Sequence, residues 1–258
     1  MKIENYGTGA RCELVMRGLM DMESRGELPS SVSRIILLPI PSSRDKVHVT
    51  GTDRLLSEVL SDTGRGDLLI GYGIPLSDVH DVESRGGMVY DAMLDEDFQQ
   101  ENARISALGA LGYILTEMKR TPEDMHIGIV GYGRIGAELV RLLLFFGARV
   151  RVYTSREQTR RELGVCGIES SFMERGAHII PDTDGLDLIV NTAPTDLAAT
   201  FGPGELPDGV RLIELASGKN FEGVAGVEYL PSIPDRMYPI SSGRIYFRAV
   251  RDHICGMA

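Results

Sequence analysis

Residues 131–136 read Gly-Tyr-Gly-Arg-Ile-Gly and lie between a short apolar run and a long amphipathic stretch. The run 127–130 is typical of a buried strand, and the stretch that begins at Ile135 carries apolar residues at helical spacing. In this context the first glycine permits a tight turn, the second lets the backbone approach a pyrophosphate, and the third lets the helix pack on its strand. The helix N-terminus then faces the anion. The sequence therefore predicts a dinucleotide site, and the alternative is a glycine-rich turn that binds nothing. The site would comprise Gly131, Tyr132, Gly133, Arg134, Ile135 and Gly136.

Composition and charge exclude several classes of protein. The chain has 258 residues and a formal charge of -10, and its basic residues are scattered, which argues against a nucleic-acid surface. No apolar run reaches the roughly 18 to 20 residues of a membrane span, and residues 1–5 lack a signal-peptide core. Three cysteines, far apart and odd in number, fit a reducing compartment and offer no metal-ligand spacing. We therefore expect a cytoplasmic protein with no nucleic-acid partner, no membrane contact and no metal.

Predicted strands and helices alternate along the whole chain, which indicates a parallel sheet covered on both faces. The expected fold class is α/β, with a Rossmann-type doubly wound parallel sheet plus a smaller flavodoxin-like α/β domain. A long interdomain helix, expected over 98–119, would join the two. Residues 1–97, with the C-terminal helix 241–258, would form the small substrate domain, and residues 120–240 the Rossmann dinucleotide-binding domain.

Three acidic residues, Asp95, Glu96 and Asp97, precede the long predicted helix. Acidic side chains complement the dipole at a helix N-terminus, and Asp95 or Asp97 can cap it. A metal site is the less favoured interpretation, because no histidine or further carboxylate is spaced to complete a coordination shell.

The end of the second strand of the nucleotide unit indicates which cofactor binds. A site for NAD normally carries Asp or Glu about 20 residues beyond the glycines, where it binds the ribose 2′-hydroxyl. Thr154, Ser155 and Arg156 stand there instead. Hydroxyls followed by an arginine suit a 2′-phosphate, because the guanidinium donates two parallel hydrogen bonds, so we favour NADP over NAD. The structural alternative is that Ser155 and Gln158 form a capping box and the arginine is only solvated.

Several further motifs follow one another in an order that covers nearly the whole chain. They are Thr8-Gly9-Ala10-Arg11, Ile36-Leu37-Leu38-Pro39-Ile40, Phe146-Gly147-Ala148-Arg149-Val150, Val190-Asn191-Thr192-Ala193-Pro194, Leu215-Ala216-Ser217 and Pro231-Ser232-Ile233-Pro234. Together with the glycine motif they resemble, in register, the motifs of the dipicolinate synthase A-subunit family. That family belongs with the dinucleotide-binding relatives of the D-2-hydroxyacid dehydrogenases. Each motif is unspecific alone, but their order and spacing are specific.

The resemblance implies a pyridine-nucleotide oxidoreductase that uses NADP and converts dihydrodipicolinate to dipicolinate during spore formation. It also implies a partner, which is a flavoprotein-like second subunit, and a nicotinamide ribose held near Asn191 and Thr192. We further expect a homo-oligomer. The cofactor site would extend to Asn191, Thr192, Ala193, Pro194, Ala216 and Ser217.

The sequence departs from the family's pattern in three places. Where the family has a second strand and helix early in the chain, only the polar linker 23–33 is present, so the first domain is shortened. Residues 91–102 replace the family's Asn-Ser-Ile-Pro-Thr-x-Glu-Gly stretch, of which Glu101 matches the glutamate. Residues 238–243 lack the lysine of its Ala-Pro-Lys-Thr-Ala-Gly stretch. These departures concern the substrate more than the cofactor.

Ligands of parallel α/β domains lie outside the carboxyl ends of the strands. In the first domain this rule points to Ser42, Ser43 and Gly73 as contacts for a small dicarboxylate substrate. From the later part of the chain, Arg236 would join them. Each serine is equally well explained as a turn residue.

Hydride transfer needs a group that removes or supplies a proton, and the sequence does not identify it. Glu101, near the start of the long helix, and His48, in a loop at the strand ends, are the candidates. A D-2-hydroxyacid dehydrogenase would require an arginine after the strand that ends at Asn191, where Pro-Thr-Asp stands. Three functions therefore stay open: an NADP-dependent oxidoreductase resembling the A-subunit of dipicolinate synthase, a D-2-hydroxyacid-dehydrogenase-like enzyme with another small carboxylate substrate, and a non-catalytic NADP(H)-binding subunit.

Overall fold

The structure is a computed structural model that describes residues 1–176, 179–200, 204–206, 208–218 and 220–257. The chain divides into two compact units, here called unit 1 (Met1–Asn102 with Pro234–Ala258) and unit 2 (Ala103–Ile233). The chain leaves unit 1 within the helix α4, Glu96–Glu117, and returns to it within α7, Ile233–Met237. The long helix expected over 98–119 thus corresponds to α4. The chain returns to unit 1 at Pro234, which is earlier than the expected return at residue 241.

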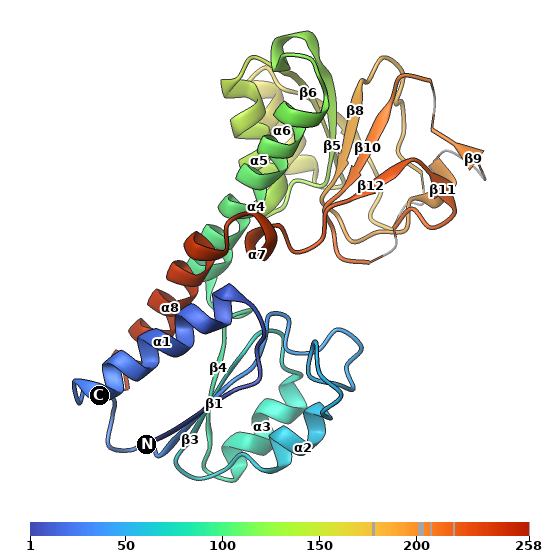
Figure 1. Ribbon diagram of the computed structural model, residues 1–258. Coiled ribbons are helices and arrows are strands. Elements are labelled where there is room, and N and C mark those ends of the chain that lie inside the picture. The colour runs from blue at the N-terminus through green and yellow to red at the C-terminus, as the bar shows by residue number, and fades with distance from the viewer. Residues whose placement is uncertain (177–178, 201–203, 207, 219, 258) are drawn as a thin grey trace. The chain divides into compact units, whose positions relative to one another are not determined.

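Unit 1 contains a parallel sheet with strand order β1-β2-β3-β4 (Figure 1). Its strands are β1 Lys2–Asn5, β2 Arg34–Leu37, β3 Asp67–Gly71 and β4 Met88–Asp91, and its helices are α1 Ala10–Ser24, α2 Leu56–Ser61, α3 Leu76–Ser84 and α8 Pro239–Cys255. Ile35 and Leu37 pack with α1 and α8, whereas Ile36 and Leu38 pack with α2 and α3. An unbroken apolar run is expected of a strand that is buried on both faces, because successive side chains point to opposite sides.

The strand order of unit 1 is a shortened form of the flavodoxin-like order 2-1-3-4-5. Removing the second strand from that order leaves the first strand beside the third, which is the arrangement of β1-β2-β3-β4. The chain between α1 and β2 has neither a strand nor a helix. The expectation of a shortened first domain agrees with this topology, and β1 consequently forms an edge of the sheet.

Unit 2 contains a six-stranded parallel sheet with strand order β7-β6-β5-β8-β10-β12. Its strands are β5 His126–Val130, β6 Arg149–Thr154, β7 Glu169–Phe172, β8 Leu188–Asn191, β10 Arg211–Glu214 and β12 Val227–Tyr229, its helices are α5 Arg134–Phe145 and α6 Glu157–Val165, and its smaller elements are the 3-10 helices η1 Pro122–Asp124 and η2 Ala198–Thr200 and the strands β9 Gly204–Glu205 and β11 Val224–Ala225. This is the 3-2-1-4-5-6 order of the Rossmann fold, whose two halves meet between β5 and β8. The expected fold class is therefore confirmed.

The two faces of the unit 2 sheet are covered differently. Helices α4, α5 and α6 pack on one face, against side chains such as Ile127 and Val190. On the other face, Ile189 and Leu212 pack with Phe221 and other residues of irregular segments and of the β9–β11 ribbon (Figure 1). We expected helices on both faces of the sheet. The described residues that cover this second face instead form mainly irregular segments. The connections after β8 and β10 are rich in glycine and proline, which weaken or break helices.

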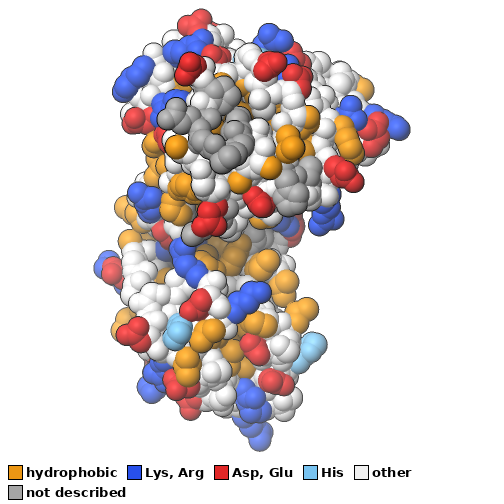
Figure 2. Space-filling model, turned by 90° about the vertical axis from the view of Figure 1, so that its right-hand side faces the viewer, with side chains coloured by type: hydrophobic (Ala, Val, Ile, Leu, Met, Phe, Trp, Pro, Cys, Tyr) orange, Lys and Arg blue, Asp and Glu red, His pale blue; other side chains and the backbone are white. Residues whose placement is uncertain are grey.

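Asp95 precedes α4 and has the capping role that the sequence favoured, while Glu96 and Asp97 lie in the first turn of the helix. The Asp95 carboxylate accepts a hydrogen bond from the backbone N–H of Phe98, at 2.9 Å, and so caps the helix. Across the described ranges, His, Cys, Asp and Glu side chains nowhere gather in threes that could hold a metal ion. Basic and acidic side chains are interspersed on the face that Figure 2 shows. None of the helices described has the length and apolar character needed to span a membrane.

Candidate functional site

The carboxyl ends of five neighbouring strands form one edge of the unit 2 sheet. Cross-strand register aligns Tyr153, Val130, Asn191, Glu214 and Tyr229 in that order along this edge. The residues expected to bind the cofactor lie at the ends of β6 and β8, in the loops that follow β5, β6, β8 and β10, and in the first turn of α5. Because ligands of this fold lie outside the carboxyl ends where the two halves of the sheet meet, this edge is the candidate dinucleotide site.

The turn between β5 and α5 has the local geometry that its glycine pattern predicts. Gly131 has a φ of 89°, and a Cβ there would lie 2.9 Å from Oγ1 of Thr192. A Cβ on Gly136 would collide with the carbonyl oxygen of Gly131, whereas nothing lies within 4 Å of a Cβ placed on Gly133. Gly131 therefore makes the turn, Gly136 lets α5 pack closely, and Gly133 leaves the space in which a pyrophosphate would lie.

The N-terminus of α5 is suited to an anion. No side chain among the described residues caps this helix, whose N-cap is Gly133, and its first turn carries no acidic residue. The first backbone N–H groups of a helix have no intrahelical partner, so they remain able to bind a phosphate. Tyr132 and Ile135 are half-buried beside the turn, and Arg134 is exposed. The open space at Gly133 and this uncapped helix end together fit a pyrophosphate.

The end of β6 leaves two polar side chains accessible. Thr154 is buried, and its Oγ1 accepts a hydrogen bond from the N–H of Arg156 at 3.3 Å. Ser155 and Arg156 are exposed, and neither side chain has a polar partner among the residues that the structure describes. The capping box considered for Ser155 and Gln158 does not form, because α6 has no side-chain cap and Gln158 donates to Glu162 instead.

The two arginines that follow in α6 differ from Arg156. Arg160 and Arg161 both pair with Glu157, at 2.9 and 3.3 Å, within their own helix. Their charges are therefore partly neutralised locally, and Arg156 is the arginine of this segment that remains available to a 2′-phosphate.

A buried carboxylate lies next to the loops after β8 and β10. Glu214 is 2% exposed, and its two oxygens accept hydrogen bonds from Nδ2 of Asn191 at 3.0 and 3.1 Å. Nδ2 of Asn220 donates to Oε2 at 3.1 Å, and the backbone N–H of Ala216 donates to Oε1 at 2.7 Å. Burial raises the pKa of Glu214, while these hydrogen bonds lower it in part. The carboxylate thus joins the loops after β8 and β10, both of which are expected to contact the cofactor.

Two of the expected residues in these loops are fixed by further hydrogen bonds. Asn191 is fully buried, and its Oδ1 accepts from the N–H of Ala193 at 3.0 Å. Oγ1 of Thr192 donates to the carbonyl oxygen of Val130 at 2.9 Å. Pro194 and Ser217 are exposed, and Ala216 is half-buried. Sequence reasoning missed Glu214, whose signal is a single acidic residue within the otherwise apolar segment 212–216.

The substrate residues expected in unit 1 lie close together, but their polar groups already have partners. Ser42 is fully buried, and its Oγ accepts from the N–H of Tyr72 at 2.7 Å. The N–H groups of Gly73 and Ile74 both donate to the carboxylate of Asp91, each at 2.8 Å. The glycine amide expected to meet a substrate carboxylate therefore binds a carboxylate of the protein itself.

Ser43 and His48 belong to the same loop after β2. The Ser43 hydroxyl donates to the Asp45 carboxylate at 3.2 Å, and Nδ1 of His48 lies 2.7 Å from it. The hydrogen bond to His48 is the largest of the effects that lower the pKa of Asp45. Arg236 lies in α7 and is exposed.

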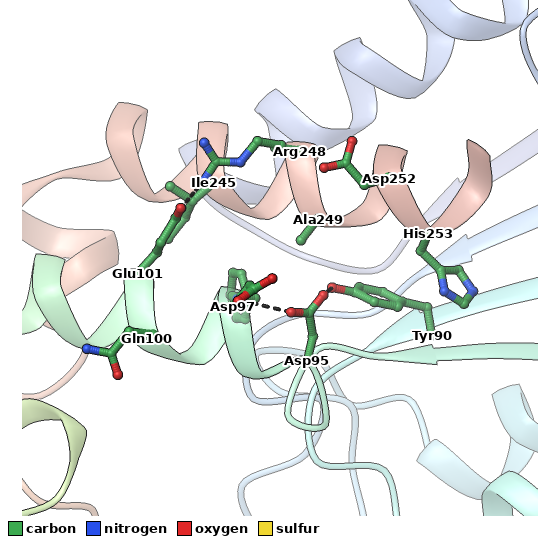
Figure 3. Close-up of a pocket in the computed structure, with 11 residues that line it drawn as sticks. Tyr90, Asp95, Asp97, Gln100, Glu101, Ile245, Arg248, Ala249, Asp252 and His253 are labelled. Atoms are coloured by element: carbon green, nitrogen blue, oxygen red, sulfur yellow. Dashed lines mark hydrogen bonds and ion pairs between the residues drawn. The ribbon is translucent and has the colours of Figure 1, made fainter. Parts of the chain in front are cut away.

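Glu101 lies apart from this loop, at a cavity of about 520 Å³ between α4 and α8 of unit 1 (Figure 3). Its carboxylate pairs with Arg248 of α8. On the same cavity the Tyr90 hydroxyl donates to Asp95 at 2.7 Å, and the ring of His253 lies 4.7 Å from that of Tyr90. Burial lowers the pKa of His253. The two candidate proton-transfer residues, Glu101 and His48, are thus both engaged by a charged neighbour.

Comparison with known proteins agrees with this geometry. The family model for the NAD-binding domain of D-isomer specific 2-hydroxyacid dehydrogenases matches residues 94–191. No curated protein matches the chain. The A-subunit of dipicolinate synthase from Bacillus halodurans is similar in structure, with a TM-score of 0.73 and 18% identity over 98% of this chain and 97% of that one. The corresponding chain of dipicolinate synthase from Bacillus subtilis gives a TM-score of 0.71 and 15% identity over 100% and 98% of the two chains.

A D-lactate dehydrogenase is a more distant structural relative. The enzyme from Aquifex aeolicus, in complex with NAD and lactic acid, has a TM-score of 0.51 and 13% identity, over 100% of this chain and 95% of that one. The resemblance to dipicolinate synthase that the motifs indicated is therefore confirmed as a likeness of fold over the whole chain. The match at residues 94–191 supports a nicotinamide dinucleotide as the cofactor and an oxidoreductase as the class of protein.

Proposed function

We propose that the chain is an NADP-dependent oxidoreductase that oxidises dihydrodipicolinate to dipicolinate. The proposal rests on the pyrophosphate space at Gly133, which occurs in a chain whose fold is like that of the dipicolinate synthase A-subunit over nearly its whole length. The residues at the edge of the unit 2 sheet fit a dinucleotide, and the exposed Ser155 and Arg156 favour one with a 2′-phosphate.

Each part of the proposed cofactor site has its own role. The open turn at Gly133 and the first amides of α5 would hold the pyrophosphate. Ser155 and Arg156 would bind the 2′-phosphate. Asn191 and Thr192, with the loop at Ala216, would orient the nicotinamide half. A bound NADP+ supplies a hydride acceptor, and oxidation of the substrate releases one further hydrogen as a proton.

The substrate side of the proposal lies in unit 1. Ser43 and Arg236 would contribute a hydroxyl and a positive charge to the recognition of a dicarboxylate. His48 and Glu101 are the proposed groups for proton transfer, although each already has a charged partner. A flavoprotein-like second subunit is proposed to be the partner that completes the reaction.

Specific observations favour two other functions. The likeness to a D-lactate dehydrogenase suggests an enzyme of that type with another small carboxylate substrate, but no arginine follows Asn191 in residues 192–196. The engagement of both Glu101 and His48 favours a non-catalytic subunit that binds NADP(H) and depends on a partner for turnover.

Two experiments in sequence test these proposals. The first titrates the protein with NADPH and NADH by fluorescence, and NADPH should bind more tightly. The second supplies dihydrodipicolinate and NADP+, with and without a candidate flavoprotein partner, and follows the absorbance of the reduced cofactor. Turnover that disappears in a Gly133→Ala variant would support the dipicolinate synthase activity. Tight NADPH binding without turnover in either mixture would favour the non-catalytic subunit.

A further inference from the structure

Glu214 is a carboxyl group in an almost fully buried position. Both of its oxygens accept hydrogen bonds from N–H donors, of Asn191 and Ala216 at Oε1 and of Asn191 and Asn220 at Oε2. The two side-chain amide nitrogens and the backbone nitrogen that contact these oxygens can only donate. A proton on either oxygen would therefore face an N–H donor and find no acceptor there. The arrangement therefore suits the carboxylate form.

No positive side chain compensates this carboxylate within the described ranges of the chain. Glu214 takes part in none of the ion pairs between described residues of unit 2, and the effects on its pKa are burial and its three hydrogen-bonding partners. A buried charge without a counter-ion is costly, because protein solvates it less well than water does. A positively charged ligand beside it would lower that cost.

The position of Glu214 relates it to one half of the proposed cofactor. The Rossmann sheet consists of two mononucleotide-binding halves, and the glycine turn after β5 places the pyrophosphate between them. The half formed by β5, β6 and β7 ends in the residues proposed for the 2′-phosphate, so the half formed by β8, β10 and β12 would take the nicotinamide nucleotide. Glu214 is the last residue of β10, in register with Asn191 at the end of β8.

The face of the sheet agrees with this assignment. Residues two apart in a strand point to the same side. Leu212 and Ile189 pack on the face that carries irregular segments, so Glu214 and Asn191, each two residues further on, lie on that face at its carboxyl edge. The carboxylate of Glu214 and the loops after β8 and β10 thus lie on the same face, at the carboxyl edge of the unit 2 sheet.

We propose that the buried carboxylate of Glu214 makes unit 2 select the oxidised form of its dinucleotide over the reduced form. The oxidised nicotinamide ring carries a positive charge and the reduced ring is neutral, so a fixed negative charge near the ring stabilises only the former. The attraction is strong because the carboxylate is shielded from water. The inference rests on the proposed dinucleotide-binding function and applies equally to NADP and NAD. In an oxidation, such selectivity keeps the site loaded with the hydride acceptor.

The test compares affinities for the two redox forms in the wild-type chain and in Glu214→Gln. The wild-type chain should bind NADP+ more tightly than NADPH, and the variant should lose on the order of tenfold in the ratio of the two affinities. Glu214→Asp keeps the charge and should keep the preference for NADP+. Glu169→Gln removes a carboxylate from the outer strand β7 of the same sheet and should leave the ratio unchanged.

A ligand without nicotinamide separates this charge effect from a loss of structure. The affinity for 2′-phospho-ADP-ribose should be the same in the wild-type chain and in Glu214→Gln if only the nicotinamide end has changed. An equal loss of affinity for NADP+ and NADPH in that variant would reduce Glu214 to a structural role and overturn the inference. Tighter binding of NADPH than of NADP+ by the wild-type chain would also overturn it, even if the variant fails to fold. Binding of neither form would instead overturn the proposed function itself.

Discussion

Arg11 in α1 and Asp235 in α7 form an ion pair in unit 1, with Nε of Arg11 2.7 Å from Oδ1 of Asp235. Arg11 is 4% exposed and also donates to Oδ1 of Asn102 at 3.4 Å. Its Nε–H is not aligned with a hydrogen-bond acceptor, so the contact with Asp235 is electrostatic. Asn102 and Asp235 lie at the two places where the chain leaves and re-enters unit 1, and one buried guanidinium therefore contacts both.

Replacing Asp235 with Asn should destabilise unit 1 strongly. The change leaves the Arg11 charge buried without a counter-ion, and such a loss costs about 3–5 kcal/mol in fully buried pairs. The Asp235 side chain is 37% exposed, so we expect about 2 kcal/mol, measured by urea denaturation. Asp21→Asn is the matched control, since Asp21 pairs with Arg25 on the surface at 2.6 Å and should contribute less than about 1 kcal/mol.

The converse substitution should be milder. Arg11→Met removes the buried charge and leaves Asp235 partly hydrated, so its cost should lie below that of Asp235→Asn. Burial already raises the pKa of Asp235 and lowers that of Arg11, which indicates that each charge is poorly solvated in the pair. If Arg11→Met lowered the free energy of unfolding more than Asp235→Asn does, the buried guanidinium would not be the member of the pair whose unpaired charge is more destabilising.

Replacing two glycines of the same turn with alanine should have different effects: one variant should lose stability, and the other should lose cofactor binding. Gly136→Ala brings a methyl group against the carbonyl oxygen of Gly131 and should destabilise unit 2 by about 1–3 kcal/mol. Gly133→Ala meets no neighbour and should change the free energy of unfolding by less than about 1 kcal/mol, but it fills the space proposed for the pyrophosphate. Calorimetric titration should therefore find a folded Gly133→Ala protein that no longer binds NADPH. Unchanged NADPH affinity in that variant would place the pyrophosphate elsewhere.

The contrast between Gly133 and Glu214 explains what the sequence could and could not predict. The glycine turn is a local device, and its strand, its helix and the role of each glycine follow from neighbouring residues. The environment of Glu214 depends on Asn191, from a strand that pairs with it only in the folded sheet. Sequence patterns show an acid in an apolar run but not the donors that surround it.

The small elements were missed for a similar reason. Strand β1 has four residues, of which two are charged, and its pairing with β2 across some 30 positions defines it as a strand. The face of the unit 2 sheet that carries irregular segments is covered by chain whose shape depends on packing against Leu212 and its neighbours rather than on periodicity. The carboxylate of Asp91, which binds the amide of Gly73, likewise comes from the next strand.

The three cysteines should differ sharply in reactivity. Cys12 is 3% exposed, and burial raises the pKa of its thiol to about 11. At pH 8 about one thousandth of it is the reactive thiolate. Cys166 and Cys255 are exposed. Iodoacetamide followed by mass spectrometry should label these two quickly and Cys12 only after unfolding in guanidinium; rapid labelling of Cys12 in the native protein would mean that α1 opens readily.

The preference for NADP should depend on Arg156 and not on the arginine five residues later. The Arg156 side chain is exposed and has no polar partner among the described residues, whereas Arg161 pairs with Glu157. Arg156→Gln removes a charge-assisted contact to the 2′-phosphate and should weaken NADPH binding by about 10- to 100-fold. NADH lacks that phosphate, so its affinity should change by less than about threefold.

Arg161→Gln is the matched control and should leave both affinities unchanged. Fluorescence titration of both variants with both cofactors checks all four values. Equal losses for NADPH and NADH in Arg156→Gln would show that this arginine supports the loop after β6 rather than the 2′-phosphate, and NADP selectivity would then need another origin.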